Sequence, residues 1–270
     1  MKTSRRFLAI CALFICLLAG KPAAWAENGS QIILRVMCYN IRHGLGMDNV
    51  IDLERTANAI RAWNPDLVAI QEVDRWTTRV NQADQAKILA EKLEMYSVFG
   101  KSIDHQGGDY GLLILSRFPI LEHRMVFLPR EDQREQRSLQ IARIGIPDAN
   151  GKIIHLANTH MSAGVAGQRA REAQIDMILS VLSEIREPVI FVGDINARPD
   201  NVVISRILET WTDAADPVSD KYVTPETHCR FGRIDYIFYR ATDPLTLLES
   251  GMIADPITSD HQPVIAVFAF

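Results

Sequence analysis

The chain has 270 residues, 47% of them hydrophobic, and a formal net charge of −4. This length is near the upper end for a single domain, and the apolar content is enough for a sizeable core. The acidic balance argues against avid, non-specific binding to nucleic acid, because such binding depends mainly on neutralising phosphates.

The first segment, residues 1–26, has the features of a secretory signal peptide. Basic residues precede an apolar run from Phe7 to Ala19, and Ala24-Trp25-Ala26 is a small-x-small cleavage pattern. We expect cleavage after Ala26 and export to the periplasm or beyond the cell, with an uncleaved signal anchor as the alternative. The apolar run is too short to favour a retained membrane span.

Cleavage would change the charge and the cysteine content of the chain. Loss of four basic residues leaves 25 of 29 against 33 acidic ones, so the net charge moves from −4 to −8. Cys38 and Cys229 remain, and we expect a buried free thiol at Cys38, although a disulfide between the two is open in an exported protein. A metal would therefore be held by oxygen or imidazole.

The mature chain, residues 27–270, alternates short apolar runs with amphipathic segments. The segments that we expect to be strands are 32–40, 66–72, 110–116, 139–146, 152–160, 188–196, 233–240 and 263–270. The segments with apolar residues at helical spacing are 53–63, 84–93 and 167–185. With no long linker, repeat or low-complexity stretch, this pattern predicts one α/β domain whose helices cover sheet faces.

Polar side chains that can act as ligands collect where the predicted strands end or begin. Four strands end on them and two begin with them; the residues are Asn40, Glu72, Asn158, His160, Asp194, Asn196, Asp235, Asp260 and His261. Such a collection at sheet ends is typical of an active site in an open sheet.

The acids among these residues have specific chemical uses. Glu72 follows an apolar run and is costly to bury without a partner, which is either an arginine or an oxygen-bound cation such as Mg²⁺. Asp194 and Asn196 point the same way if the chain stays extended, and an Asp beside an Asn amide suits proton acceptance from water. An Asx-type turn is the alternative for this pair.

The histidines give less specific evidence. His160 and His261 have no second histidine at metal-ligand spacing, so we interpret them as donors to a charged oxygen, with Asp260 or Asp235 orienting one ring. The lone His105, His123, His155 and His228 are interpreted as surface or core residues, and His43 is undecided. The mature chain has no GxSxG, P-loop, HExxH or CxxC motif, which leaves metal-assisted attack of water on a phosphoester.

Seven short motifs along residues 32–270 resemble one family. They are YNI (39–41), QEV (71–73), LSR (115–117), NTH (158–160), GDIN (193–196), RIDY (233–236) and SDH (259–261), in the order found in the endonuclease/exonuclease/phosphatase superfamily. The resemblance implies a four-layer α/β/β/α sandwich, with two packed mixed sheets flanked by helices as in deoxyribonuclease I. It also implies a phosphoester hydrolase that depends on Mg²⁺ or Mn²⁺.

The resemblance also implies residue roles. Glu72 is similar to the metal-binding glutamate, with Asn40 beside it at the metal and phosphate, and Asp260 to a second metal or histidine-orienting acid. Asp194 resembles the aspartate that activates water, and Asp235 the one that supports a catalytic histidine. The remaining implied residues near the phosphate are Asn196, Asn158, Arg137 and Tyr110, with Asp109 as the alternative to Tyr110. Arg171 is implied as a support, and His160 and His261 are implied to act against the charge that develops on phosphorus.

One departure concerns the substrate. Abasic endonucleases carry a metal-binding aspartate two residues after the asparagine of the first motif, and this chain has Arg42 there. We therefore expect an exported, monomeric hydrolase of a small soluble phosphoester rather than a DNA-repair enzyme. An extracellular nuclease is one alternative, and an inactive scaffold that binds a phosphorylated ligand is another.

Overall fold

The computed structural model describes residues 32–131, 135–147, 151–215 and 226–270. All of them belong to one compact unit that spans residues 31–270. The predicted signal peptide, residues 1–26, lies outside the described residues, so cleavage and export stay predictions. No helix among the described residues is long and apolar enough to cross a membrane.

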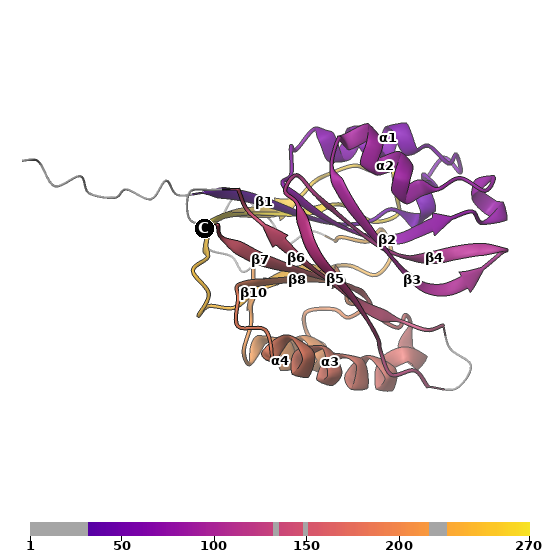
Figure 1. Ribbon diagram of the computed structural model, residues 1–270. Helices are drawn as coiled ribbons and strands as arrows, with labels where there is room; N and C mark the ends of the chain where they lie inside the picture. The colour runs from indigo at the N-terminus through magenta and orange to yellow at the C-terminus, as the bar shows by residue number, and fades with distance from the viewer. Residues whose placement is uncertain (1–31, 132–134, 148–150, 216–225) are drawn as a thin grey trace, which may run out of the picture. The chain divides into compact units, whose positions relative to one another are not determined.

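Two mixed sheets form the centre of the fold (Figure 1). The first sheet has the order β11-β12-β1-β2-β4-β3. Its strands are β1 (Ile33–Asn40), β2 (Leu67–Arg75), β3 (Tyr96–His105), β4 (Gly108–Ser116), β11 (Thr246–Met252) and β12 (Val264–Ala269). The second sheet has the order β5-β6-β7-β8-β10-β9. Its strands are β5 (Ile120–Phe127), β6 (Ser138–Gly145), β7 (Ile153–His160), β8 (Val189–Asp194), β9 (Thr212–Asp213) and β10 (Asp235–Tyr239).

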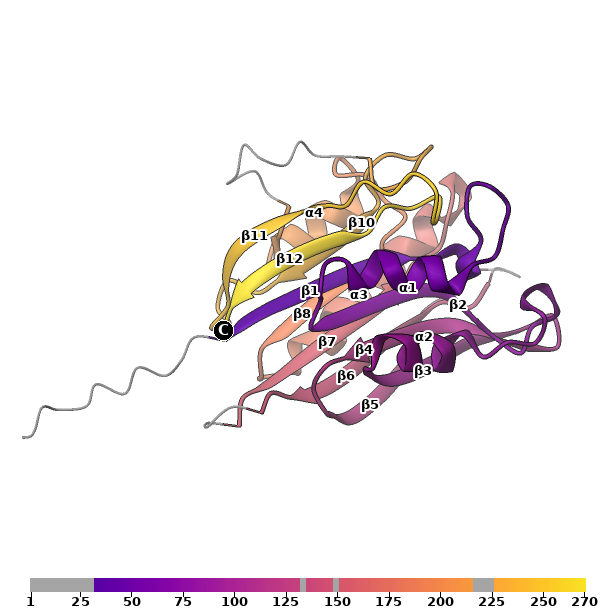
Figure 2. The ribbon, with the colours of Figure 1, turned by 90° about the horizontal axis from the view of Figure 1, so that it is seen from above.

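The α-helices lie on the two outer faces of this pair of sheets. They are α1 (Leu53–Arg61), α2 (Gln85–Leu93), α3 (Gln168–Ser183) and α4 (Val202–Leu208). Side chains of Asp52, Asp84 and Asn201 accept hydrogen bonds from the first turns of α1, α2 and α4, so three of the four begin at an N-cap of the preferred kind. Viewed from above, α1 and α2 cover the first sheet, and β1 and β12 lie side by side (Figure 2).

Three apolar clusters hold the four layers together. Alternate residues of β1, β2, β7, β8 and β12 form the cluster between the sheets, among them Cys38 and Val192. The opposite faces of these strands pack against α1 and α2 on one side and against α3 and α4 on the other. The predicted four-layer sandwich is confirmed, and Cys38 is a buried free thiol while Cys229 is exposed and unpaired.

Each sheet is built around one parallel pair of strands. β1 pairs with β2 in parallel, β7 pairs with β8 in parallel, and the other strand pairs of both sheets are antiparallel. In each pair an α-helix connects the two strands, α1 in the first sheet and α3 in the second. β1, β7 and β8 end on Asn40, His160 and Asp194, and Glu72 lies three residues before the end of β2.

The strands that the sequence did not predict are the edge strands of the two sheets. β3, β5 and β11 are partly exposed along most of their length, so they lack the continuous apolar run of a buried strand. The short β9 and the seven-residue α4 were also not predicted. The predicted interior strands and three predicted helices are present with shifts of a few residues at their ends.

Candidate active site

The predicted polar residues meet because their strands end at one edge and share one face. His160 is opposite Asp194 in the parallel pair β7–β8, and Asp235 is opposite Asp194 in the antiparallel pair β8–β10. Cys38 and Val192, two residues before Asn40 and Asp194, lie in the core between the sheets. Since side chains alternate along a strand, Asn40 and Asp194 also point between the sheets.

Glu72 reaches the site through an irregularity in β2. The register of β2 against β4 shifts between Ile70 and Val73, and Glu72 has a left-handed backbone with φ 59°. Ile70 and Val73 both pack toward the helices, so the bulged segment turns Glu72 out of the regular alternation. A strained non-glycine residue held by its surroundings is a feature often found at functional sites.

Asn40 links the acids of the two sheets. Its Nδ2 donates to Glu72 Oε1 at 3.2 Å and to Asp194 Oδ2 at 3.1 Å, and its Oδ1 accepts from the backbone N–H of Arg42 at 3.0 Å. The Ser259 hydroxyl donates to the Asn40 carbonyl at 2.8 Å, which ties β1 to the loop before His261. Asn40 is fully buried, so these contacts fix its position.

Asp194 is a buried carboxylate with an altered proton affinity. Its Oδ2 lies 3.3 Å from His160 Nε2 and 3.8 Å from His261 Nε2. Burial and the nearby charge of Asp235 raise the pKa of Asp194 to about 7, against the lowering effect of His261. A carboxylate with such a pKa is suited to accept a proton near neutral pH.

His261 and Asp235 form a buried hydrogen-bonded pair. His261 Nδ1 lies 2.9 Å from Asp235 Oδ2, and both residues are almost fully buried. Burial disfavours charge on His261, but the charge and hydrogen bond of Asp235 outweigh it and raise the pKa of His261 to about 10. His261 is therefore a cation, with Nε2 directed toward Asp194.

Replacement of Asp235 by asparagine is expected to lower kcat by about 10–100-fold, because the ring of His261 loses the acid that orients and charges it. The pKa of His261 should fall in the same variant, which NMR titration of its ring would detect. Asp104→Asn, at an exposed ion pair with Lys101, is the matched control. An unchanged His261 titration would contradict this role of Asp235.

His160 differs from His261 in charge. Burial, followed by the charges of Arg137 and His261, lowers the pKa of His160 well below its usual range. The ring is therefore neutral, and its Nδ1 is buried without a hydrogen-bond partner among the described residues. His160 can donate a hydrogen bond in the site, but it does not contribute a positive charge.

Tyr110 and Arg137 lie on the Glu72 side of the site. Burial, together with the charge of Glu72, raises the pKa of Tyr110 well above its usual range, and a hydrogen bond with Arg137 opposes that shift. Arg137 is itself buried and pairs with Glu135 at 3.0 Å. Both side chains therefore lie close enough to influence Glu72 electrostatically.

His228 belongs to the site although the sequence predicted no role for it. Its ring packs edge-on against that of His261, with centroids 4.6 Å apart, and its Nδ1 accepts from the backbone N–H groups of Arg230 and Phe231. When neutral, the ring therefore carries its proton on Nε2. An isolated histidine in a loop has no periodic signal, so no sequence pattern could have placed it here.

Asp260 has a cationic neighbour. Its Oδ2 lies 3.5 Å from Arg42 Nε and 3.9 Å from His228 Nε2, and its side chain is 22% exposed. Asp260 does not orient His261, since Asp235 has that position.

The structure decides between the two alternatives for Asn196 and shows the contacts of Arg171. Asn196 is not extended: its φ is 53°, its N–H donates to Asp194 Oδ1 at 3.0 Å, and its Nδ2 donates to the carbonyl of Met161. The chain thus forms the Asx-type turn, which leaves Asn196 at the rim of the site. Arg171 is buried and donates to the carbonyls of Ser162 and Gly164, so it supports the loop after β7.

Asn158 lies one layer below the site rather than in it. Its Oδ1 accepts from Gln71 Nε2 at 2.8 Å, and its Nδ2 donates to the carbonyls of Ile70 and Leu113 on the opposite sheet. All its polar atoms are thus occupied, and the structure does not place Asn158 at a phosphate. It instead connects the two sheets directly beneath the catalytic layer.

Asn158→Ala should therefore reduce the free energy of unfolding by about 2–4 kcal/mol, because it leaves buried polar groups of both sheets unpaired. The kcat/KM of the folded variant should change little. Urea unfolding with Asn58→Ala, on the exposed face of α1, as control would measure the difference. A stable but inactive Asn158→Ala protein would restore the phosphate-binding prediction.

The donor atoms of the site fit a hard divalent cation. Two groups of described residues, Asp194 with Asp235 and His261, and His228 with Asp260 and His261, have potential ligand atoms within 4.8 Å of one another. Glu72 belongs to neither group, but burial raises its pKa, and no ion pair joins it to another described residue. Asp235 Oδ1 is also buried without a partner among the described residues.

Comparison with known proteins identifies the family. Residues 37–261 match the family described as "Endonuclease/Exonuclease/phosphatase family". The chain belongs to this family. The superfamily that the sequence motifs resembled is thereby confirmed, and its members include phosphoester hydrolases.

Individual relatives of this family member are distant. YbhP of Escherichia coli K12 is 28% identical over 186 residues, which cover 63% of this chain and 69% of YbhP. The 5'-tyrosyl-DNA phosphodiesterase of Caenorhabditis briggsae is 24% identical over 212 residues, covering 75% of this chain and 56% of that protein. An endonuclease/exonuclease/phosphatase structure from Beutenbergia cavernae has a TM-score of 0.73 at 24% identity, covering 88% of this chain and 72% of its own.

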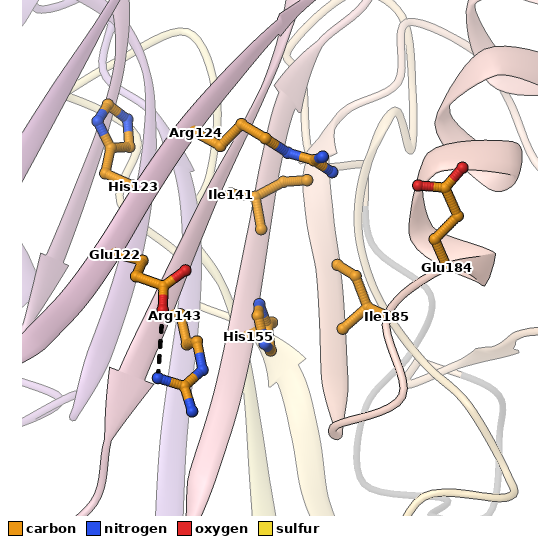
Figure 3. A pocket seen from close by; sticks show the side chains of 8 residues that line it. All are labelled: Glu122, His123, Arg124, Ile141, Arg143, His155, Glu184 and Ile185. Carbon is orange, nitrogen blue, oxygen red and sulfur yellow. Dashed lines mark hydrogen bonds and ion pairs between the residues drawn. The ribbon is translucent and has the colours of Figure 1, made fainter.

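A second hollow lies away from the site, near the other end of β7. It has a volume of about 290 Å³ and is lined by residues of β5, β6, β7 and the end of α3 (Figure 3). His155 lines it and bonds Glu187 at 2.9 Å, and Arg143 contacts both Glu187 and Glu122. These charges pair with one another, so His155 keeps the structural interpretation predicted for it from the sequence.

Proposed function

We propose that the protein is a divalent-metal-dependent phosphoester hydrolase in which Asp194 activates the attacking water. The observation that carries the proposal is the charge of the site. Three acids, Glu72, Asp194 and Asp235, face two cations among the described residues. His261 contacts Asp194 and Asp235, and Arg137 acts on Glu72 without forming an ion pair with it. Such an excess of buried negative charge needs a cation, and phosphoester hydrolysis commonly uses one.

The protein groups have separate roles in this proposal. Asp194, with its pKa near 7, accepts the proton of the water that attacks phosphorus. His261 is held as a cation by Asp235 and donates from Nε2 to a phosphoryl oxygen on which negative charge develops. Neutral His160 adds a hydrogen bond, and we assign Arg137 to another oxygen of the substrate. The Asn196 amide, which was expected at the phosphate, is held by the Met161 carbonyl.

Glu72 would hold the cation, and Asn40, whose Nδ2 donates to Glu72 Oε1, would fix the position of that carboxylate. When bound, Mg²⁺ or Mn²⁺ would neutralise phosphoryl charge as a Lewis acid. Because Arg42 already lies against Asp260, we assign Asp260 a weaker part than the sequence suggested and propose one cation rather than two.

For the substrate, we propose a small soluble phosphoester acted on by an exported, monomeric enzyme. The net charge of −4, or −8 after the expected cleavage, disfavours a long nucleic acid, since each phosphate contact needs a basic group. The relative from Caenorhabditis briggsae is named for a phosphodiester, so both monoesters and diesters belong in the test.

The test is a substrate panel with purified protein. It contains 4-nitrophenyl phosphate, bis(4-nitrophenyl) phosphate, a sugar phosphate and single-stranded DNA, each with EDTA and with Mg²⁺ or Mn²⁺ restored. We expect hydrolysis of a small ester that EDTA removes and the metal restores. Preference for DNA would favour the nuclease alternative, and metal or phosphate binding without any turnover would favour the inactive scaffold.

A further inference from the structure

An open pocket of about 580 Å³ is lined in part by Asn196, two residues after Asp194. Arg171 of α3 and three loops line it: residues 163–165 after β7, residues 196–201 after β8, and residues 230–234 before β10. The three loops adjoin strands β7, β8 and β10, which carry His160, Asp194 and Asp235. Asn196, at the rim of the site, lines the pocket as well, so the pocket continues the catalytic site outward.

The pocket has an apolar lining that extends to the catalytic histidine. Val165 is 93% exposed and Phe231 is 57% exposed, although both line the pocket with Ile234. The Phe231 ring packs against His228 with centroids 4.5 Å apart, and His228 packs against His261. Exposed apolar side chains beside a polar reaction centre are typical of a surface that binds part of a ligand.

Two arginines of this pocket lack an anionic partner. Arg198 and Arg230 line it, and neither forms an ion pair with a described carboxylate, although Asp200 lies in the same lining. The guanidinium of Arg198 packs at the turn of Gly232, whose φ is 76°, and a Cβ added to Gly232 would lie 3.6 Å from Arg198 Cζ. Phosphate or carboxylate groups are the usual partners of such guanidinium groups.

We propose that this pocket binds a second anionic group of the substrate, carried on an apolar or aromatic body, and thereby selects among phosphoesters. The proposal rests on the proposed function, because it assigns the catalytic site to the phosphoester and the pocket to the remainder of the same molecule. The volume is within the range of small-molecule sites. The preferred substrate is thus a compact phosphoester with a carboxylate or second phosphate.

The experiment compares two esters that differ by one anion. They are 4-nitrophenyl phosphate and the same ester with a carboxylate beside the nitro group. Substitution of both Arg198→Ala and Arg230→Ala is expected to lower kcat/KM for the carboxylated ester by about ten-fold or more, and to leave 4-nitrophenyl phosphate unchanged. Because each protein is tested on both esters, their intrinsic reactivities cancel in the ratio.

Two further variants sharpen the result. Arg230→Glu should reverse the preference between the esters, whereas Arg124→Ala, an exposed arginine of the distant hollow, should change neither rate. Equal effects of the arginine variants on both esters, or no effect on either, would overturn the proposal while leaving the hydrolase function intact.

If wild-type protein hydrolyses neither ester, the proposed function fails first. Calorimetric titration with the carboxylated ester then tests, without any turnover, whether the pocket binds the ester. Binding that the double arginine variant weakens would still support the pocket, and binding that is absent or independent of both arginines would overturn it.

Discussion

Asp194→Asn is expected to lower kcat by about 10³-fold without lowering the melting temperature. Asparagine keeps the size of the side chain but can keep only one of the two hydrogen bonds accepted from Asn40 Nδ2 and the Asn196 N–H. It cannot accept a proton from water, and general-base catalysis contributes about 10²–10⁴-fold. Burial and Asp235 raise the pKa of Asp194 to about 7, so above that pH the wild-type carboxylate is ionised against the preference of the fold. The neutral amide of asparagine removes the repulsion between this carboxylate and that of Asp235.

The measurement is kcat together with thermal unfolding at pH 8, where wild-type Asp194 is ionised. Asp176→Asn, an exposed acid of α3 that pairs with Arg206, is the control and should retain full activity. An Asp194→Asn protein with the kcat of the wild type would contradict the role of Asp194 as proton acceptor. A drop in both activity and melting temperature would instead indicate a structural role.

Glu72→Gln is expected to lower kcat by at least about 10²-fold and to weaken Mg²⁺ or Mn²⁺ binding. A bound cation supplies several kcal/mol of stabilisation to a charged transition state, and each 1.36 kcal/mol corresponds to ten-fold in rate. Glutamine has the same size and can still accept the hydrogen bond from Asn40, so the variant tests the loss of negative charge alone.

Titration calorimetry of Mn²⁺ into wild type, Glu72→Gln and the exposed control Glu91→Gln would measure the affinity directly. Activity of Glu72→Gln that recovers at high metal concentration would support weakened binding as the cause. Unchanged Mn²⁺ affinity would exclude Glu72 as the metal ligand and direct attention to the carboxylates of Asp194 and Asp235.

The sequence predicted the position of the candidate site well because its signal is local. Apolar strands that end on polar residues, such as Val192 before Asp194, mark both the strand and the face on which the polar group lies. Asp235 and His261 precede their strands instead of following them. They reach the same edge only if those strands run antiparallel to the strands that end on Asn40 and Asp194. The family resemblance supplied the sandwich arrangement, which periodicity alone cannot distinguish from other α/β folds.

The features that the sequence missed depend on contacts between distant segments. The bulge at Glu72 is defined by the register of β2 against β4, and the place of Asn158 by carbonyls on the opposite sheet. His228 lies in the site because its loop contacts His261. Arg42 contacts Asp260 although more than two hundred residues separate them in the sequence. None of these pairings leaves a periodic pattern in the chain.

The order of strands in the first sheet has a consequence for biosynthesis. β12 lies between β11 and β1, so the sheet that begins with residue 33 is completed only by residues 246–269. During translation the N-terminal part of a chain is available to fold first. Here β1 cannot pair with β12 until residues 264–269 have been synthesised. Because His261 lies in that same segment, the candidate site cannot be complete before residues 246–269 have been synthesised.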